Sequence, residues 1–422
     1  MDALATGAVT QAPLPAVAPE PDVGQRAAQA PSNERGTPVS VAQVREQLGA
    51  IIDDRDVAGI RIRSEFESGG LTVAPPAGQL DKADPDGSEG LFQTSDGKHA
   101  VVIDTVASQA NRMEEALKGA ASEVDYPLFV VTGVERVGRR NTSLDWPHRQ
   151  ADAHWRLLQD QAIREGHLSD EDVQAIRDAT VWDAEALLRW FPASVLFGWW
   201  HSVPKETKTK TTAENQTIRN DLRDARSNVA ANTSAARSAR VVTSEVIAHG
   251  VSVAPRLCAR IDPFGPLPGG TKAAPSAYSQ GGLVTLPPSK SNPAVTYERI
   301  EGATFIGFSH LRHFCFGECT GEGRVLALAL SLLAVTEARY DLHLRSGADL
   351  ILKGKPVCTL EGGSGPVGFE LPSRADLVGL VRSIGTGTFG WNGPLTIQAP
   401  ATYLRIASVA AEHQAAAGGD EG

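Results

Sequence analysis

The sequence predicts an α+β fold with a split βαβ core, of the ferredoxin-like or RRM-like kind. A strand–helix–strand succession is expected early in the chain, at residues 100–131, and a second one late, at residues 304–352. The chain has 422 residues, of which 41% are hydrophobic, so it can bury one large core with insertions or two smaller ones. The stretches between the two successions are therefore expected to be long insertions into the core.

Before the early succession, apolar residues at helical spacing predict a helix at residues 39–52. Alternating side chains predict short strands at residues 60–63 and 71–73. Residues 75–97 are turn-rich and acidic, which is typical of a loop between strands.

The early succession begins with the β-branched residues 100–103, which are typical of a buried strand. Ser108 is a good N-cap candidate for the next helix, which is expected to end near Gly119. Residues 127–131 form the next expected strand. The buried stripe of the helix should be Val106, Ala110, Met113 and Leu117.

The first turns of this helix carry polar side chains that suit a phosphate backbone: Ser108, Gln109, Asn111 and Arg112. A helix start offers unpaired backbone N–H groups and a partial positive charge, and both favour anions. An ordinary amphipathic helix with a solvated polar face is the simpler interpretation, and chemistry alone favours it.

The middle of the chain is expected to be helical and then extended. A helix is predicted at residues 182–190, ended by Phe191 and Pro192. Residues 195–197 are expected to form a core strand that ends in the pair Trp199–Trp200. Exposed aromatic rings beside basic residues can stack on bases, but both tryptophans are expected in the core.

Two insertions stand out by composition. Residues 205–240 hold eight Lys or Arg and four Asp or Glu, a local charge of +4 with partly helical spacing. A solvated helix with local salt bridges explains this pattern, and so does a groove wall that follows phosphates, which we favour. Residues 262–293 are dense in Gly, Pro and Ser and should form a long loop or an extended hairpin.

The late succession consists of a strand at residues 304–308, a long apolar helix at residues 324–340 and a strand at residues 349–352. Two glycine-rich turns are expected after it, at residues 361–365 and 385–387. Glycine turns let a backbone approach a phosphate closely, although alone they are weak signals.

Bulk properties exclude some classes of protein. A net charge of −10 and a pI near 5.5 argue against indiscriminate nucleic-acid binding, yet they allow a local basic groove. No apolar run approaches the roughly 20 residues of a membrane span, and no signal pattern opens the chain, so a cytoplasmic protein is expected. Residues 1–38 and 413–422 are expected to be disordered tails.

The cysteines are few and should be free thiols in a reducing compartment: Cys258, Cys315, Cys319 and Cys358. Cys315 and Cys319 lie close to His310 and His313, residue types that zinc prefers. Because the spacing matches no standard zinc site, we expect no metal and no other cofactor.

Five segments of the chain, taken in order, resemble one CRISPR family. Together they are similar to the RAMP backbone subunit of type I-G (formerly I-U) Cascade complexes, over roughly residues 40–400. No single segment is specific, but the order of all five is. The segments are residues 106–114, 142–153, 191–200, 237–246 and 307–312.

The resemblance implies a RAMP palm with a helical insertion and a protruding thumb, for which residues 75–97 and 262–293 are both candidates. It also implies a glycine-rich loop near residues 362–365. The implied function is a non-catalytic scaffold whose copies assemble along the spacer of a guide RNA, beside other Cascade subunits and away from any membrane. Base pairing of the guide would then select the DNA target.

By position in the five segments, the resemblance implies RNA contacts from ten residues: Ser108, Gln109, Asn111, Arg112, His148, Arg149, Arg237, Arg240, His310 and Arg312. A RAMP endoribonuclease that cuts the guide precursor is an alternative. Its acid–base pair would be His148 with Asp152 or His310 with His313. A zinc-stabilised protein-interaction module built on Cys315 and Cys319 is a third hypothesis.

Overall fold

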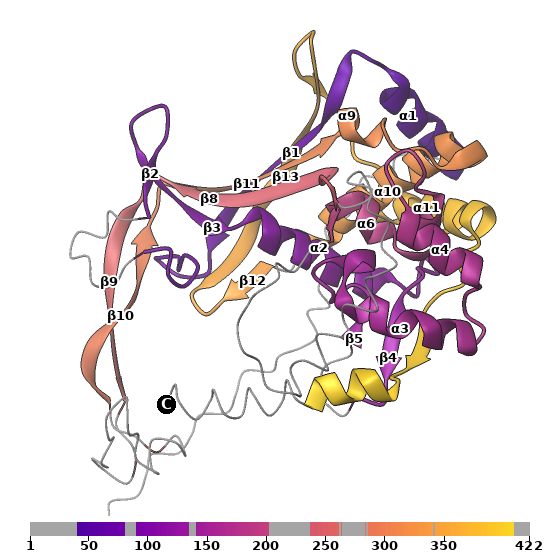
Figure 1. The fold of residues 1–422 in the computed structure, drawn as a ribbon. Coiled ribbons are helices and arrows are strands. Elements are labelled where there is room, and N and C mark those ends of the chain that lie inside the picture. Colours follow the sequence, from indigo (N-terminus) through magenta and orange to yellow (C-terminus); the bar gives the residue numbers. More distant parts are fainter. Residues whose placement is uncertain are drawn as a thin grey trace, which may run out of the picture. The chain divides into compact units, whose positions relative to one another are not determined.

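The computed structural model of the chain describes residues 40–80, 90–134, 141–201, 237–260, 286–340 and 342–408, together with residues 263 and 283. Within these residues the fold is a mixed α+β arrangement, as predicted (Figure 1). The two predicted tails, most of the basic stretch 205–240 and most of the loop 262–293 lie outside the described residues.

A large antiparallel sheet, which curls into a half-barrel, organises the fold (Figure 1). Its strand order is β12-β13-β1-β11-β8-β3-β2, with β14 paired to β13. The strands are β1 (Val57–Ser68), β2 (Phe92–Gln93), β3 (His99–Asp104), β8 (Val242–His249), β11 (Arg299–Gly307), β12 (Leu342–Arg345), β13 (Ala348–Gly362) and β14 (Val367–Gly368).

Two helices, α2 (Val106–Ala120) and α10 (Thr320–Ala338), pack against each other and cover one face of this sheet. The path from β1 to β8 contains α2, and the path from β11 to β13 contains α10. Each path skips one strand, since β11 lies between β1 and β8 and β1 lies between β11 and β13. This is the connectivity of a split βαβ motif.

The late succession is confirmed as β11, α10 and β13, but the early one is divided between two sheets. β4 (Phe129–Thr132) does not return to the large sheet and pairs instead with β5 (Asn141–Thr142) and, in parallel, with β15 (Leu395–Gln398). The ring of Phe129 stacks on Trp155 at 5.1 Å between centroids, so burial in a separate aromatic core draws this strand away.

The segments before β3 agree with the sequence in part. Helix α1 (Val41–Asp53) is confirmed, and Ser40 closes a capping box at its start. The strand expected at residues 60–63 is the middle of β1, which is longer than predicted. The strand expected at residues 71–73 is wrong, since only Val73 forms an isolated bridge, to Val295.

The helical part of the chain between the two sheets contains η1 (Arg149–Ala151), α3 (Ala153–Arg164), α4 (Asp170–Asp178), α5 (Glu185–Trp190) and α6 (Pro192–Phe197). The strand predicted at residues 195–197 is wrong, because these residues form α6. Pro192 is the first residue of that helix, where proline is pre-organised and lacks no needed hydrogen bond.

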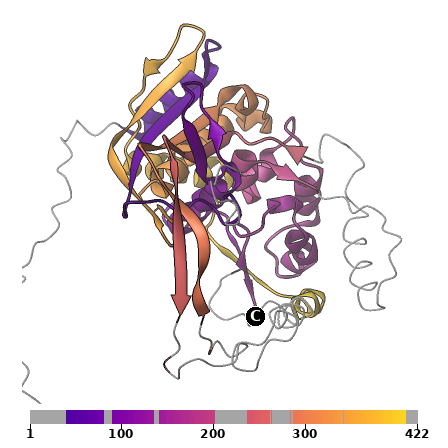
Figure 2. The ribbon, with the colours of Figure 1, turned by 90° about the vertical axis from the view of Figure 1, so that its left-hand side faces the viewer.

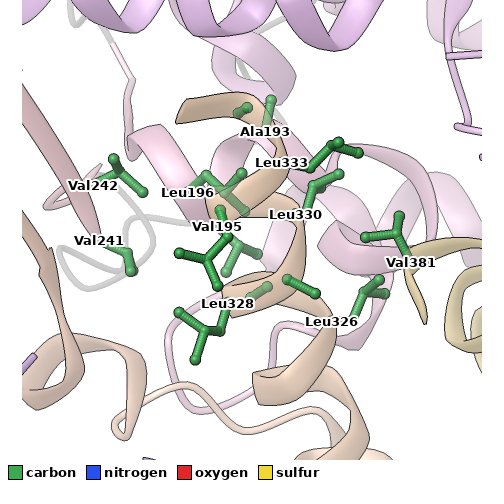
Figure 3. Packing of buried hydrophobic residues seen from close by; sticks show 14 of the residues in the cluster. Ala193, Val195, Leu196, Val241, Val242, Leu326, Leu328, Leu330, Leu333 and Val381 are labelled. Carbon is green, nitrogen blue, oxygen red and sulfur yellow. The ribbon is translucent and has the colours of Figure 1, made fainter. Parts of the chain in front are cut away.

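Helix α10 forms the centre of the main core, and it is apolar on all sides because α1, α2, α6 and α11 (Arg374–Phe389) surround it. Figure 3 shows Val195 and Leu196 of α6 beside Leu328 and Leu330 of α10. The segment Gly317–Ala338 is long and apolar enough to cross a membrane, and 67% of its apolar window is buried inside the protein, as in a core helix.

The turn predicted at residues 385–387 is also wrong, because these residues lie within α11. Gly385 is needed there for close packing, since a Cβ atom at this position would approach the ring of Trp391 to 2.3 Å. The turn after β13 is confirmed, and Gly365 has a φ of +90° there.

A two-stranded ribbon, β9 (Ser252–Arg260) and β10 (Leu286–Thr296), extends beyond β8 and β11 (Figure 2). It agrees with the extended hairpin predicted around residues 262–293, of which residues 286–293 are strand. The base of the ribbon is held by Arg256, whose Nη2 donates to Thr72 Oγ1 at 3.0 Å.

Candidate nucleic-acid interface

A short pair of strands brings the candidate residues together. β6 (Trp199–Trp200) pairs antiparallel with β7 (Arg237–Ser238), and Trp200 lies directly opposite Arg237. Successive side chains of a strand point to opposite faces, so Trp199 is buried at 4% exposure and Trp200 is 57% exposed. The prediction of a core position is thus confirmed for Trp199 and wrong for Trp200.

We call the group around this strand pair the Trp200 surface; it consists of Trp200, His148, Arg237, Arg240 and, next to Ser238 on the other face of the strand pair, His310. The ring of His148 meets the ring of Trp200 edge-on, 5.8 Å between centroids. Arg237 is exposed and Arg240 is half-buried. Neither arginine forms an ion pair with another residue that the structure describes.

Asp152 does not serve as an acid–base partner of the His148 ring. Its Oδ2 accepts the backbone N–H of His148 at 3.1 Å, and its Oδ1 accepts the backbone N–H of His154 at 3.0 Å. The carboxylate is therefore the N-cap of α3. The structure thus gives no support to the first of the two pairs considered for a nuclease.

His310 lies on α9 (Phe308–Leu311), and its Nε2 is 3.0 Å from Ser238 Oγ, next to Arg237. Burial, together with the neighbouring His313, lowers the pKa of His310. The imidazole is thus neutral at pH 7 and acts as a hydrogen-bonding group, not as a cation.

Arg149 is buried beneath the Trp200 surface and does not reach solvent. Its Nε donates to Glu114 Oε1 at 2.7 Å, and its Nη1 donates to the carbonyl of Gly198 at 2.9 Å. The side chain is 5% exposed. The predicted phosphate contact is corrected accordingly: the guanidinium is already paired, and it positions the segment that leads into Trp200.

Arg240 lies close to this buried pair. Burial and the positive charge of Arg149 lower the pKa of Arg240, and the carboxylate of Glu114 opposes the shift. Gly198 lets the two chain segments approach, since a Cβ atom on it would lie 2.5 Å from the carbonyl oxygen of Ser238. Its φ of +73° also favours glycine.

The start of α2 differs from the prediction at the cap. Thr105, not Ser108, is the N-cap, and its side chain accepts the backbone N–H of Ser108 at 3.2 Å. The helix begins at Val106, so Ser108 lies inside the first turn. Ser108 is half-buried and Asn111 is exposed, so both are still accessible to a ligand.

Gln109 and Arg112 bind a buried carboxylate instead of facing solvent. Asp104 is fully buried, and its Oδ2 accepts from Gln109 Nε2 at 2.6 Å and from Arg112 Nε at 2.9 Å. Arg345 Nη2 lies 3.4 Å from the other oxygen of Asp104. Gln109 and Arg112 therefore belong to a structural cluster, which we call the Asp104 clasp, and their RNA contacts stay a prediction.

Arg312, two residues after His310, lies at the end of α1. Its guanidinium donates to the backbone carbonyls of Ile52, Asp54 and Val57. Carbonyls at a helix C-terminus have no partners within the helix, and a cation there is favourable. Arg312 thus caps the C-terminus of α1, and its RNA contact stays a prediction.

The five sequence segments that carry the resemblance converge at this place. Each contributes a side chain or carbonyl to one continuous set of contacts, in order Glu114, Arg149, Gly198, Ser238 and His310. The sequence identified four of the residues of the Trp200 surface and missed Trp200. Only the strand register, which sets Trp199 inward and Trp200 outward, could have revealed it.

Metal ligands are not assembled in the described part of the chain, where no group of three or more His, Cys, Asp or Glu side chains could hold an ion. Cys315, Cys319 and Cys358 are free thiols. The Sγ of Cys315 lies 3.5 Å from Thr320 Oγ1.

Comparison with known proteins bears on the family. A search of curated proteins found no match. The sequence model of the family described as CRISPR-associated protein GSU0053 matches residues 62–215, a range that contains the first three of the five segments. Residues 62–215 of this chain are therefore similar to the CRISPR-associated protein GSU0053 family, a RAMP-type family of type I-U (I-G) CRISPR systems.

Proposed function

We propose that the protein is a non-catalytic backbone subunit of a type I-G CRISPR surveillance complex. Its copies would assemble along the spacer of a guide RNA in the cytoplasm, beside other Cascade subunits, and present the guide for pairing with target DNA. The observation that carries this proposal is the convergence of the five sequence segments around one strand pair, with aromatic, basic and imidazole side chains.

The chemistry of the Trp200 surface suits the sugar–phosphate backbone of RNA. Arg237 and Arg240 can meet phosphates, and neutral His310 and Ser238 can exchange hydrogen bonds with ribose 2′-hydroxyls. Phosphates and ribose hydroxyls are the same in every nucleotide, so these contacts would not depend on sequence. In this proposal the large curled sheet is the RAMP palm and the β9–β10 ribbon is its thumb.

The endoribonuclease remains the second candidate through one observation. His310 has a lowered pKa and lies near His313 and Ser238, so it could accept a proton at neutral pH. Incubation with labelled repeat RNA in the presence of EDTA separates the two functions. Discrete products that disappear in a His310→Ala variant would favour the enzyme, and uncut RNA that stays bound would favour the scaffold.

Assembly on RNA tests the main proposal. The protein is co-expressed with a CRISPR array and its partner subunits, and then analysed by size-exclusion chromatography with light scattering. We expect a large species rich in nucleic acid that carries guide-length RNA. An RNA-free monomer beside an intact array transcript, with all partners present, would contradict the proposal.

A further inference from the structure

We propose that Trp200 is a stacking platform for one unpaired base of the guide RNA, with Arg237 binding the adjacent phosphate. This inference rests on the proposed function and adds to it the part of the nucleotide that the site recognises. A base has an apolar face that an exposed indole can cover, whatever the base is.

The exposure of Trp200 is fixed by the fold. The neighbouring Trp199 is buried in the main core, with its ring 6.3 Å from that of Phe314. Alternation along β6 then forces Trp200 outward. An indole exposed by 57% is a large apolar surface left in water, and stacking on a base removes it from water.

The platform is also held in place from below. Arg149 binds the carbonyl of Gly198 at 2.9 Å, and Glu114 binds Arg149 at 2.7 Å, so the chain entering β6 is tied to α2. The ring of His148 packs against the indole in a T-shaped arrangement, with 5.8 Å between the ring centroids. A rigid aromatic side chain loses little conformational entropy when a ligand binds.

The neighbours of Trp200 favour a nucleotide over a protein partner. Arg237 lies opposite it across the strand pair, where side chains on the same face approach each other closely. Arg240 lies in the connection that follows β7. Residues that dominate a protein–protein interface are instead surrounded by contacts that exclude water. The surroundings of Trp200 are charged and open to solvent.

Trp182 provides a matched control within the same chain. It is 65% exposed, like Trp200, but it lies on a turn next to the acidic Asp183. Its backbone N–H donates to Thr180 Oγ1 at 3.2 Å. We expect no base stacking at Trp182, because a carboxylate beside the ring repels the phosphate that a stacked base would bring.

Stacking on Trp200 is tested by comparing a single-stranded RNA with an abasic RNA of the same length in filter-binding assays. The proteins are the full-length wild type, Trp200→Ala, Trp200→Phe and Trp182→Ala. We expect Trp200→Ala to weaken binding of the base-containing RNA roughly 5- to 150-fold. Trp200→Phe should keep most of the affinity, Trp182→Ala should keep all of it, and the abasic RNA should bind every protein alike.

The outcomes separate the two proposals. Binding of both RNAs with no effect of Trp200→Ala would overturn the stacking platform and leave the proposed function standing. A loss of self-association without RNA in Trp200→Ala, with RNA affinity unchanged, would also overturn it and make Trp200 a protein contact. Failure of the wild type to bind either RNA, alone or in complex with its partner subunits, would overturn the proposed function itself.

Discussion

The buried ion pair of Glu114 and Arg149 is the strongest electrostatic feature near the Trp200 surface. Both side chains are about 5% exposed, and Nε and Oε1 are 2.7 Å apart. Burial raises the pKa of Glu114, and the charge of Arg149 opposes the shift. Such a pair contributes little net stability, but removing one partner leaves an uncompensated charge in the core.

We therefore predict that Arg149→Met lowers the free energy of unfolding by about 3–5 kcal/mol. The double variant Glu114→Gln/Arg149→Met should cost clearly less than Arg149→Met alone, because no charge remains buried. Urea unfolding followed by circular dichroism measures both. If the double variant loses as much free energy of unfolding as Arg149→Met and Glu114→Gln lose together, the two residues do not act as a pair.

A second prediction concerns acid sensitivity. The Nδ1 of His154 lies 2.5 Å from the hydroxyl of Tyr403. Asn141 of β5 donates to the same hydroxyl, so Tyr403 joins residues 401–408 to the smaller sheet. Burial lowers the pKa of His154, so the unfolded chain binds its proton more tightly than the folded chain does. This stabilisation is fully present above the unfolded pKa of about 6.5 and is lost as pH falls below it.

The measurement is the melting temperature between pH 8 and pH 5 for the wild type and His154→Gln. Stability of the wild type should fall below about pH 6.5, and His154→Gln should show a shallower fall. His343→Gln is the control, because His343 is exposed beside Asp349. Equal slopes in the wild type and His154→Gln would contradict the role of His154.

At this scale the sequence identifies which residues are charged, but not which of them are already paired. Arg112, Arg149 and Arg312 all look available for phosphates in the sequence. Their partners are a carboxylate on β3, a carboxylate on α2 and carbonyls at the end of α1 and the start of β1. These partners lie 8 to 260 residues away along the chain, so local spacing cannot reveal them.

Among the elements, the Asp104 clasp joins strands from opposite ends of the large sheet. Asp104 ends β3, and Arg345 ends β12, which is the outermost strand at the other end. Arg345 Nη1 also donates to the carbonyl of Ile103 at 2.9 Å, and Arg112 reaches the carbonyls of His343 and Leu344. The clasp therefore holds the curled sheet in its half-barrel form.

We predict that Arg345→Met loosens β12 locally without unfolding the protein, because Arg112 still neutralises Asp104. Hydrogen exchange of β12 amides should accelerate by the equivalent of about 1–3 kcal/mol, the cost of unpaired buried polar groups. Exchange within β1 and β11 of Arg345→Met should stay as in the wild type. The control variant Arg299→Met, which changes an exposed arginine, should exchange like the wild type at every amide. Uniform acceleration across the whole sheet would contradict a local clasp.

Elements with strong periodicity were predictable, and elements set by their surroundings were not. Helices α1 and α10 follow from apolar spacing or length alone. Residues 195–197 have strand-like composition but form α6, because Pro192 starts a helix and α10 offers it a packing surface. β4 was found as a strand, but its place in a second sheet depends on Phe129 and the aromatic core around it.

For the whole molecule, an acidic chain carries its candidate nucleic-acid interface on a local group of cations. The net charge of −10 disfavours general nucleic-acid binding, yet many acidic side chains are paired with arginines elsewhere on the described surface. Among the residues that the structure describes, Arg237 and Arg240 have no acidic partner in an ion pair, so both are candidates to bind an anionic ligand. The five sequence segments predicted most residues of this interface, and the exposure of its central side chain, Trp200, was found only in the structure.

The proposed grip on guide RNA is tested most directly by the salt dependence of binding to guide-length RNA, measured for the wild type and for Arg237→Gln/Arg240→Gln. Two RNAs of unrelated sequence are used, and Arg382→Gln, which alters an exposed arginine paired with Asp125, is the control. We predict an equal loss of affinity for both RNAs. We also predict a salt slope shallower by about 1.4, because each phosphate of a single strand that an arginine neutralises adds roughly 0.7 to the slope. An unchanged slope, or cleavage of the bound RNA by the wild type, would contradict a scaffold that grips its guide through the Trp200 surface.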